Sequence, residues 1–176
     1  MKKLTSVIAV AALSGAVLAG CATVPADGPS GRPVAFEAED FAWSTRSGRN
    51  AISGKVEYRA QGGGAYACPA GASVGLTPDT PFSRQRIQRL YGSTVYAALP
   101  LETVRGRQGV EAATGDYSRF VRAVQCDAQG RFRFENLPDG AWFVIARARP
   151  VNGRGQEMAI MRRVETRGGR SQTVPL

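Results

Sequence analysis

The stretch GRFRFENLPDGAWFVIARARP, residues 130–150, constrains the fold of this chain more than any other feature of its sequence. Residues 131–134 alternate strictly between arginine and phenylalanine, a pattern typical of a strand with one buried face. Residues 137–140 (Leu-Pro-Asp-Gly) predict a turn, because proline fixes φ and glycine tolerates a positive φ. Residues 141–149 begin with apolar side chains on both sides, which predicts a second strand that is covered on both faces.

Strand signals recur at short intervals along the rest of the chain. We expect further strands at residues 51–59, 73–77, 95–99, 119–126, 158–166 and 171–176. One helix is expected, since Thr80 suits the N-cap, Pro81 suits the first helical position, and Gly92 follows Tyr91 as a stop. Residues 100–115 carry little pattern and are predicted to form a loop. This spacing of strands and turns predicts a mainly β chain folded as a β-sandwich.

The run CDAQGRFRFENLPDGAWFVIA, residues 126–146, resembles the signature of the carboxypeptidase regulatory-like domains, which share the transthyretin-like (prealbumin-like) sandwich. The positions that match are Asp127, Gly130, Phe132, Phe134, Leu137, Pro138, Gly140 and Trp142. Residues 52–56 (ISGKV) resemble the first strand of these domains. The resemblance implies a transthyretin-like seven-stranded Greek-key β-sandwich, with residues 78–115 as an insertion that carries the short helix. It implies a fold and no chemistry, so we interpret Glu135 and Asp139 as solvated turn acids.

Residues 1–20 resemble the signal peptide of a bacterial lipoprotein, and residues 18–21 (Leu-Ala-Gly-Cys) resemble a lipobox. The apolar stretch contains no acid and is too short to be a good membrane-spanning helix. We therefore expect Cys21 to be lipidated and to become the first residue of the mature chain. Because Ala22 follows it, resemblance to sorted lipoproteins implies a lipid anchor in the outer membrane, with the domain facing the periplasm.

The segment after the lipidation site is poor in large apolar residues. Residues 21–33 contain three prolines among small or polar residues, which predicts a flexible tether. Residues 34–176 are then expected to form one domain, long enough to bury a substantial core.

Cys68 and Cys126 are the two cysteines that remain beside Cys21. In an exported chain such a pair is more often bonded than free, so we expect a disulfide that closes a loop of nearly sixty residues. Two thiols in a chain without histidine make a poor zinc site. We expect neither a metal nor a cofactor.

The chain contains no histidine, the residue that usually serves as a general base or activates a serine or cysteine nucleophile. Residues 71–75 do spell the G-x-S-x-G pattern of a nucleophile elbow. That pattern needs a preceding strand, a following helix and a histidine, so Ser73 is interpreted as a strand residue. A pair of carboxylates acting as a hydrolase of cell-envelope polymers remains an alternative, because geometry defines such a pair. We expect a protein that is not an enzyme.

Basic residues outnumber acidic ones by 23 to 14, a formal net charge of +9. Export argues against a nucleic-acid partner and favours anionic headgroups, glycans or another envelope protein. Arg84, Arg86 and Arg89 of the predicted helix are candidates for a basic contact surface. The alternative interpretation is a helix that packs by its apolar face and exposes solvated arginines.

These features predict a non-catalytic envelope lipoprotein, a tethered β-sandwich that serves as a binding or structural module at the outer membrane. The alternative is an accessory subunit that docks another envelope protein during secretion or assembly. The sequence leaves the choice between the two open.

Overall fold

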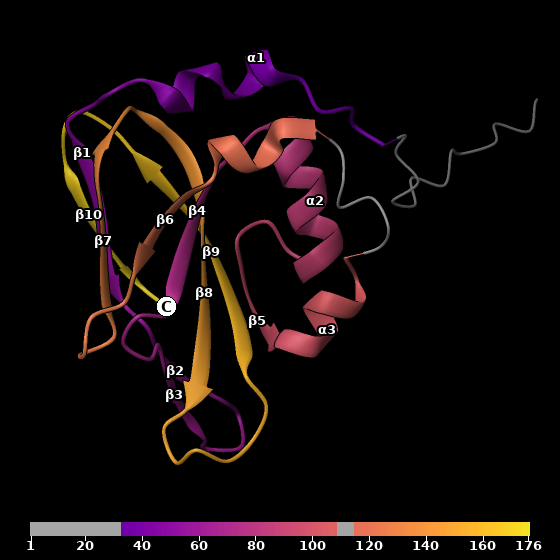
Figure 1. Cartoon of the computed structure of the whole chain (residues 1–176), viewed down its shortest axis with the longest axis vertical. Helices are drawn as coiled ribbons and strands as arrows, with labels where there is room; N and C mark the ends of the chain where they lie inside the picture. Colours follow the sequence, from indigo (N-terminus) through magenta and orange to yellow (C-terminus); the bar gives the residue numbers. More distant parts are fainter. Residues whose placement is uncertain (1–32, 109–114) are drawn as a thin grey trace, which may run out of the picture. The chain divides into compact units, whose positions relative to one another are not determined.

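The computed structural model describes residues 33–108 and 115–176 (Figure 1). Its strands are β1 (Asn50–Lys55), β2 (Glu57–Arg59), β3 (Ala65–Ala67), β4 (Ser73–Pro78), β5 (Tyr96–Pro100), β6 (Arg122–Gln125), β7 (Arg131–Leu137), β8 (Gly140–Pro150), β9 (Met158–Thr166) and β10 (Ser171–Pro175). Its helices are α1 (Ala38–Phe41), α2 (Pro81–Tyr91) and α3 (Leu101–Gly106), with 3-10 turns η1 (Ala42–Thr45) and η3 (Gly115–Phe120). The predicted signal peptide, Cys21 and nearly all of the predicted tether lie outside the described residues.

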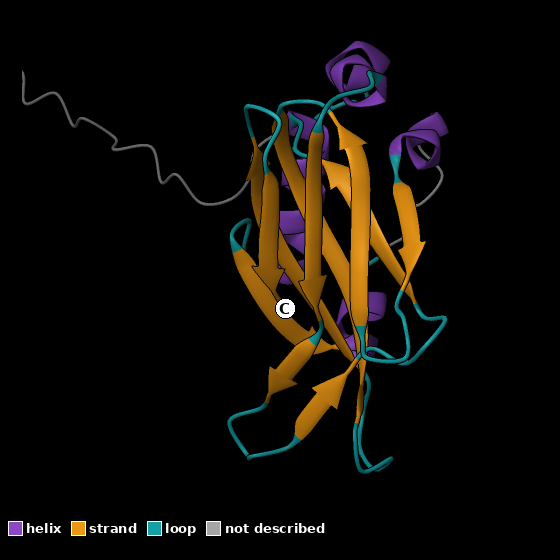
Figure 2. Ribbon diagram, turned by 90° about the vertical axis from the view of Figure 1, so that its left-hand side faces the viewer, coloured by secondary structure: helices purple, strands orange, loops and turns teal. Residues whose placement is uncertain are grey.

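The strands form two sheets that enclose one core. The smaller sheet has the order β10-β1-β7, and the larger has the order β2-β3-β8-β4-β6, with β9 beside β8 and β5 beside β9. The strands run along the long axis of the molecule, with helices behind them and at one end (Figure 2). The prediction of a mainly β fold is confirmed. The described residues form ten strands where the family resemblance implied seven, and the transthyretin-like Greek-key order stays a prediction.

The predicted strand at residues 51–59 is divided between the two sheets. β1 lies between β10 and β7, whereas β2 pairs with β3 in the larger sheet. Val56 separates them, is fully buried, and donates its N–H to the carbonyl of Gly130 over 3.0 Å. A single run of alternating residues therefore links the two sheets, which local alternation alone does not reveal.

Helix α2 begins and ends as predicted. Thr80 and Ser83 form a capping box, Pro81 opens the helix, and Gly92 ends it in the left-handed conformation at φ 72°. The apolar face of the helix packs on the outer side of the larger sheet, where its core includes Ile87, Leu90, Tyr91, Phe143, Ala159 and Met161. The inner side of β8 faces the main core through Trp142, so this strand is covered on both faces as predicted.

The segment predicted as a loop at residues 100–115 contains a helix. α3 occupies Leu101–Gly106, and Val104 is the residue that it buries. Besides Val104, only the partly buried Leu101 of this helix packs on the neighbouring apolar cluster, and two apolar residues in one short helix give too weak a periodicity to be recognised in the sequence.

An aromatic cluster joins the start of the described chain to the helices. Its rings belong to Phe36, Phe41, Phe82, Tyr117 and Phe120, with centroid separations from 5.0 Å for Phe41–Phe120 to 6.4 Å for Phe41–Phe82. α1 consequently lies across one end of the strands (Figure 1). Nearby, Trp43 packs on Trp142 at 4.8 Å, against Gly140, where a Cβ would lie 2.1 Å from the indole of Trp43.

The two acids of the opening segment have different roles. Glu135 is exposed and pairs with Arg133, as expected of a solvated acid. Asp139 is also an exposed turn residue, and in addition its Oδ1 accepts hydrogen bonds from Asn50 Nδ2 at 2.8 Å and from the backbone N–H of Gly168 at 3.0 Å. Asp139 thus joins the β7–β8 turn to β1 and to the β9–β10 connection.

Candidate functional site

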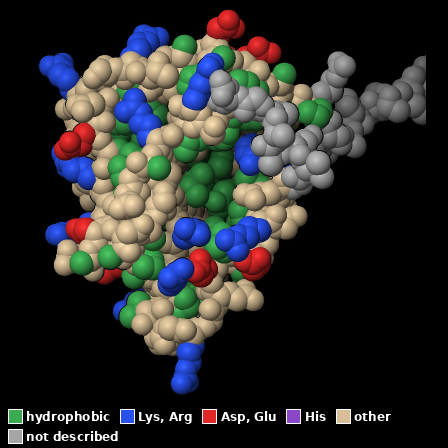
Figure 3. Space-filling view, in the orientation of Figure 1, with side chains coloured by type: hydrophobic (Ala, Val, Ile, Leu, Met, Phe, Trp, Pro, Cys, Tyr) green, Lys and Arg blue, Asp and Glu red, His purple; other side chains and the backbone are tan. Residues whose placement is uncertain are grey.

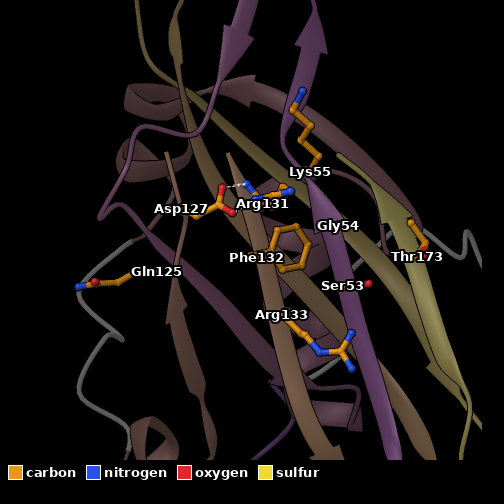
Figure 4. A pocket seen from close by; sticks show the side chains of 9 residues that line it. All are labelled: Ser53, Gly54, Lys55, Gln125, Asp127, Arg131, Phe132, Arg133 and Thr173. Carbon is orange, nitrogen blue, oxygen red and sulfur yellow. Dashed lines mark hydrogen bonds and ion pairs between the residues drawn. The ribbon is translucent and has the colours of Figure 1, made fainter. Parts of the chain in front are cut away.

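A polar groove of about 630 Å³ lies over the smaller sheet and the turn that leads into it (Figure 4). The residues that line it are Ser53, Gly54, Lys55, Gln125, Asp127, Arg131, Phe132, Arg133 and Thr173. They come from β1, β7 and β10, from the end of β6, and from the β6–β7 turn. Residues from distant parts of the sequence therefore form one continuous surface.

Strand register places the polar side chains of the groove in rows. Ser53 is opposite Thr173 on β10 and Arg133 on β7, so a hydroxyl, a hydroxyl and a guanidinium lie side by side. In the next outward row, Lys55 is opposite Arg131. Alternate residues of a strand point to the same face, which is why these side chains all face outward.

Gly54 lies between the two rows, and because it has no side chain the neighbouring strand β10 and the ring of Phe132 can lie close to its backbone. A Cβ at this position would lie 2.2 Å from the carbonyl oxygen of Val174 and 2.7 Å from the ring of Phe132. Any larger residue would force β10 or the ring of Phe132 to move. Glycine therefore allows the close packing on which the shape of the groove depends.

Each cation of the groove has its own carboxylate partner. Lys55 pairs with Glu57, Arg131 Nε lies 2.7 Å from Asp127 Oδ2, and Arg133 Nε lies 2.7 Å from Glu135 Oε1.

The pKa of Asp127 is lowered, first by hydrogen bonding from the backbone N–H of Arg131 and then by its guanidinium, so this carboxylate stays ionised as an acceptor. The groove offers donors and acceptors with its charges largely balanced. That arrangement suits hydrogen bonding to a ligand rich in hydroxyl groups.

The predicted disulfide between Cys68 and Cys126 is present and supports one end of the groove. Cys126 lies in sequence between the lining residues Gln125 and Asp127. Its backbone N–H donates to Ala72 at 2.9 Å, and its carbonyl accepts from Gly71 at 2.9 Å. The bond thus holds the β6–β7 turn against the loop before β4, and it indicates an extracytoplasmic location.

The structure does not bring the three predicted arginines of α2 together. Arg84 makes a bidentate ion pair with Asp79, with both N–O distances 2.9 Å. Arg86 stacks over Tyr117 at 5.9 Å, and Arg86 and Arg89 line a separate pocket of about 250 Å³ with residues 33–36. Positions 84 and 86 lie about 200° apart around a helix, so one face cannot present all three. The contact role of Arg84, Arg86 and Arg89 stays a prediction.

Basic side chains are also interspersed with acids elsewhere on the molecule. On the face seen in Figure 1, they surround a hollow lined by hydrophobic side chains (Figure 3). Ser73, from the G-x-S-x-G pattern, is an exposed residue at the start of β4. In the described ranges no cluster of three metal-ligating side chains occurs, and no helix there is long and apolar enough to cross a membrane.

Sequence reasoning missed the groove although one of its signals is visible. The outward polar residues of 53–55 and 131–133 follow from strict alternation. What the pattern does not show is that β1 lies between β7 and β10. That pairing, set by the fold of the whole chain, decides which polar residues become neighbours.

No protein-family model and no curated protein matches the sequence. Among solved structures, the fold is similar to a crystal structure of PA1324 from Pseudomonas aeruginosa, described as a "putative carbohydrate binding protein". The TM-score is 0.57 and the sequence identity 18%, over 80% of this chain and 96% of that chain. At this identity the likeness shows a shared mainly β fold. Membership of the carboxypeptidase regulatory-like family is not shown.

Proposed function

We propose that this protein is a non-catalytic glycan-binding module of the cell envelope and that glycans bind in the groove over β10, β1 and β7. The observation that carries the proposal is the double row of hydroxyl and paired charged groups on one face of a sheet. The structural likeness to PA1324, which is described as carbohydrate binding, points the same way.

The balance of charge in the groove favours hydroxyl groups as ligands. A sugar hydroxyl both donates and accepts, so it can bridge a guanidinium and its carboxylate without separating them. An inorganic anion, in contrast, would have to compete with Glu57, Asp127 or Glu135 for the same cations.

The polar side chains of the groove recur at regular distances, which suits the binding of a polymer. Neighbouring strands lie about 4.8 Å apart, and outward residues on one strand recur about every 6.7 Å. A chain of sugar rings can therefore contact several polar groups in turn. Many weak contacts of this kind give binding without any catalytic group.

The envelope location rests on the disulfide and on the residues before the domain. We propose that residues 1–20 are a lipoprotein signal peptide, that Cys21 is lipidated, and that residues 21–33 tether the domain of residues 34–176 to the outer membrane. Two or more acyl chains are needed for stable anchoring, at about 0.8 kcal/mol for each buried methylene. The anchor would then leave the groove free to bind glycans.

The test compares two serine variants. Ser53 lines the groove, whereas Ser118 is an exposed residue of η3 that does not line it. Ser53→Arg and Ser118→Arg add the same bulk and the same charge. Binding of the purified protein to a panel of soluble polysaccharides is measured by isothermal titration calorimetry.

We expect Ser53→Arg to weaken glycan binding at least about tenfold, since it obstructs the row formed with Thr173 and Arg133. Ser118→Arg should bind like the unmodified protein. Equal affinities of the two variants, or no polysaccharide bound by the unmodified protein, would refute the proposal.

The alternative, an accessory subunit that docks another envelope protein by a sheet edge, has one observation in its favour. β5 pairs only with β9 among the described strands, and Val95 beside it is 69% exposed. Such an edge can accept a strand from a partner. A single stoichiometric protein that co-purifies from native membranes and is lost in Val95→Lys would support docking.

A further inference from the structure

A second cavity of about 420 Å³ continues the groove along β7. It is lined by Arg122, Ala123, Val124, Arg133, Phe134 and Glu135. Arg133 lines both spaces, so the two are neighbours along a path that runs from Lys55 to Arg122. The path follows the space between β6 and β7, which in the described sheets pair only with β4 and β1, respectively.

Arg122, at the far end of this path, differs from the other cations. Its Nη2 donates to the carbonyl of Ser44 at 2.6 Å, and its guanidinium lies over the ring of Trp142 at 5.6 Å. Among the described residues, no carboxylate forms an ion pair with it. Lys55, Arg131 and Arg133, in contrast, all have one.

These contacts hold the guanidinium in place but leave its charge without a counter-ion. A guanidinium has five N–H donors, and the bond to Ser44 uses one of them. Partial burial lowers the pKa of Arg122, the direction expected when no opposite charge compensates for lost water. A carboxylate that binds here would supply that charge in the bidentate geometry that arginine favours.

The charge of the cavity indicates what kind of anion fits. Two cations, Arg122 and Arg133, and one acid, Glu135, line it, which leaves a charge of +1. A carboxylate carries one negative charge and balances this. A phosphate monoester carries close to two negative charges, which exceeds the charge of the cavity.

We propose that Arg122 binds a carboxylate of the ligand and that the protein therefore prefers acidic, carboxylate-bearing glycans. This inference rests on the proposed function, since it places the carboxylate at one end of a glycan that lies in the groove. The neighbouring rows bind the hydroxyl groups of the same chain. Arg122 supplies the preference for acidic sugars.

The test uses two probes with the same sugar chain, one with free carboxylates and one with its carboxylates neutralised as methyl esters. Oligogalacturonate carries a carboxylate on every sugar, and in its methyl ester these groups are blocked. The dissociation constants of the purified protein for both probes are measured by calorimetry at constant salt. Arg122→Gln is compared with Arg105→Gln, which removes an exposed arginine of α3 that pairs with Glu102.

We expect the unmodified protein to bind the acid about tenfold or more tightly than the ester, as one charge-assisted contact implies. Arg122→Gln should remove this difference and leave binding of the ester unchanged, whereas Arg105→Gln should retain it. Equal binding of both probes by the unmodified protein would overturn the inference, while an effect of Ser53→Arg on the ester would still support the groove. Binding of neither probe would also overturn the inference, whereas the proposed function is decided by the polysaccharide panel.

A second variant keeps the test decisive if Arg122→Gln does not fold. Glu135 is exposed, so Glu135→Gln should leave the fold intact while it removes the acid beside the cavity. We expect tighter binding of oligogalacturonate and unchanged binding of its ester. Weaker or unchanged binding of the acid by Glu135→Gln would contradict the assignment.

Discussion

Asp79 offers the sharpest test of how this fold is held together. Its side chain is completely buried at the junction of β4 and α2. Arg84 donates to both of its carboxylate oxygens at 2.9 Å, and Arg163 of β9 donates to Oδ2 at 2.6 Å. One carboxylate therefore joins a strand end, the first turn of a helix and a second strand.

Asp79→Asn removes the charge while it keeps the shape of the side chain. Three charge-assisted hydrogen bonds are worth at most about 1.5 to 3 kcal/mol each. The arginine side chains are 56% and 31% exposed, so water recovers much of this when the carboxylate is lost. We expect a net loss of roughly 2 to 3 kcal/mol in the free energy of unfolding, or a Tm lower by about 6 to 9 °C.

Urea unfolding followed by tryptophan fluorescence measures this loss, since Trp142 is fully buried and Trp43 packs on it. Glu102→Gln is the control, because it breaks the exposed pair with Arg105 and should change stability by less than about 0.5 kcal/mol. If Asp79→Asn unfolds at the same urea concentration as Glu102→Gln, the reasoning from burial is wrong.

Three further predictions follow from single features. Burial raises the pKa of Tyr91 from 10.0 to about 12, so the unfolded chain loses this proton before the folded domain does. The free energy of unfolding should therefore fall by roughly 2 to 3 kcal/mol as pH rises from about 10 to 12. If the free energy of unfolding of Tyr91→Phe falls by the same amount, Tyr91 is not the cause. Replacing Cys68 and Cys126 by alanine should cost about 4 kcal/mol in chemical denaturation, and an unchanged midpoint would contradict the chain-entropy argument. Cys21→Ser should accumulate unprocessed precursor on immunoblots, and continued processing would rule out the lipobox.

Local chemistry made several elements predictable from the sequence. Thr80 and Gly92 correctly predicted the start and the end of α2, because capping depends on a few adjacent residues. The alternation in residues 131–134 and the apolar start of β8 indicated their buried faces for the same reason. The disulfide was predictable because only two cysteines remain beside Cys21 in a chain for which we predicted an export signal.

The tertiary structure alone decided which of these elements meet. Asp79 and Arg163 are 84 residues apart, and no local pattern indicates that a carboxylate after a strand is buried against two arginines. Arg84 and Arg86 lie close together on α2, yet Arg84 pairs with Asp79 and Arg86 lies over Tyr117, which belong to different parts of the chain. Sequence spacing locates a residue on a helix, but the surrounding fold determines its contacts.

The groove shows most clearly which features follow from the sequence and which depend on the tertiary structure. That Ser53, Arg133 and Thr173 are outward strand residues follows from alternation in the sequence. That they form one row depends on β1 lying between β7 and β10, in a register set by burial of Ile52, Phe134 and Val174. A shift of one residue would turn every side chain of a strand to the opposite face, so the site exists only because the whole core specifies that register.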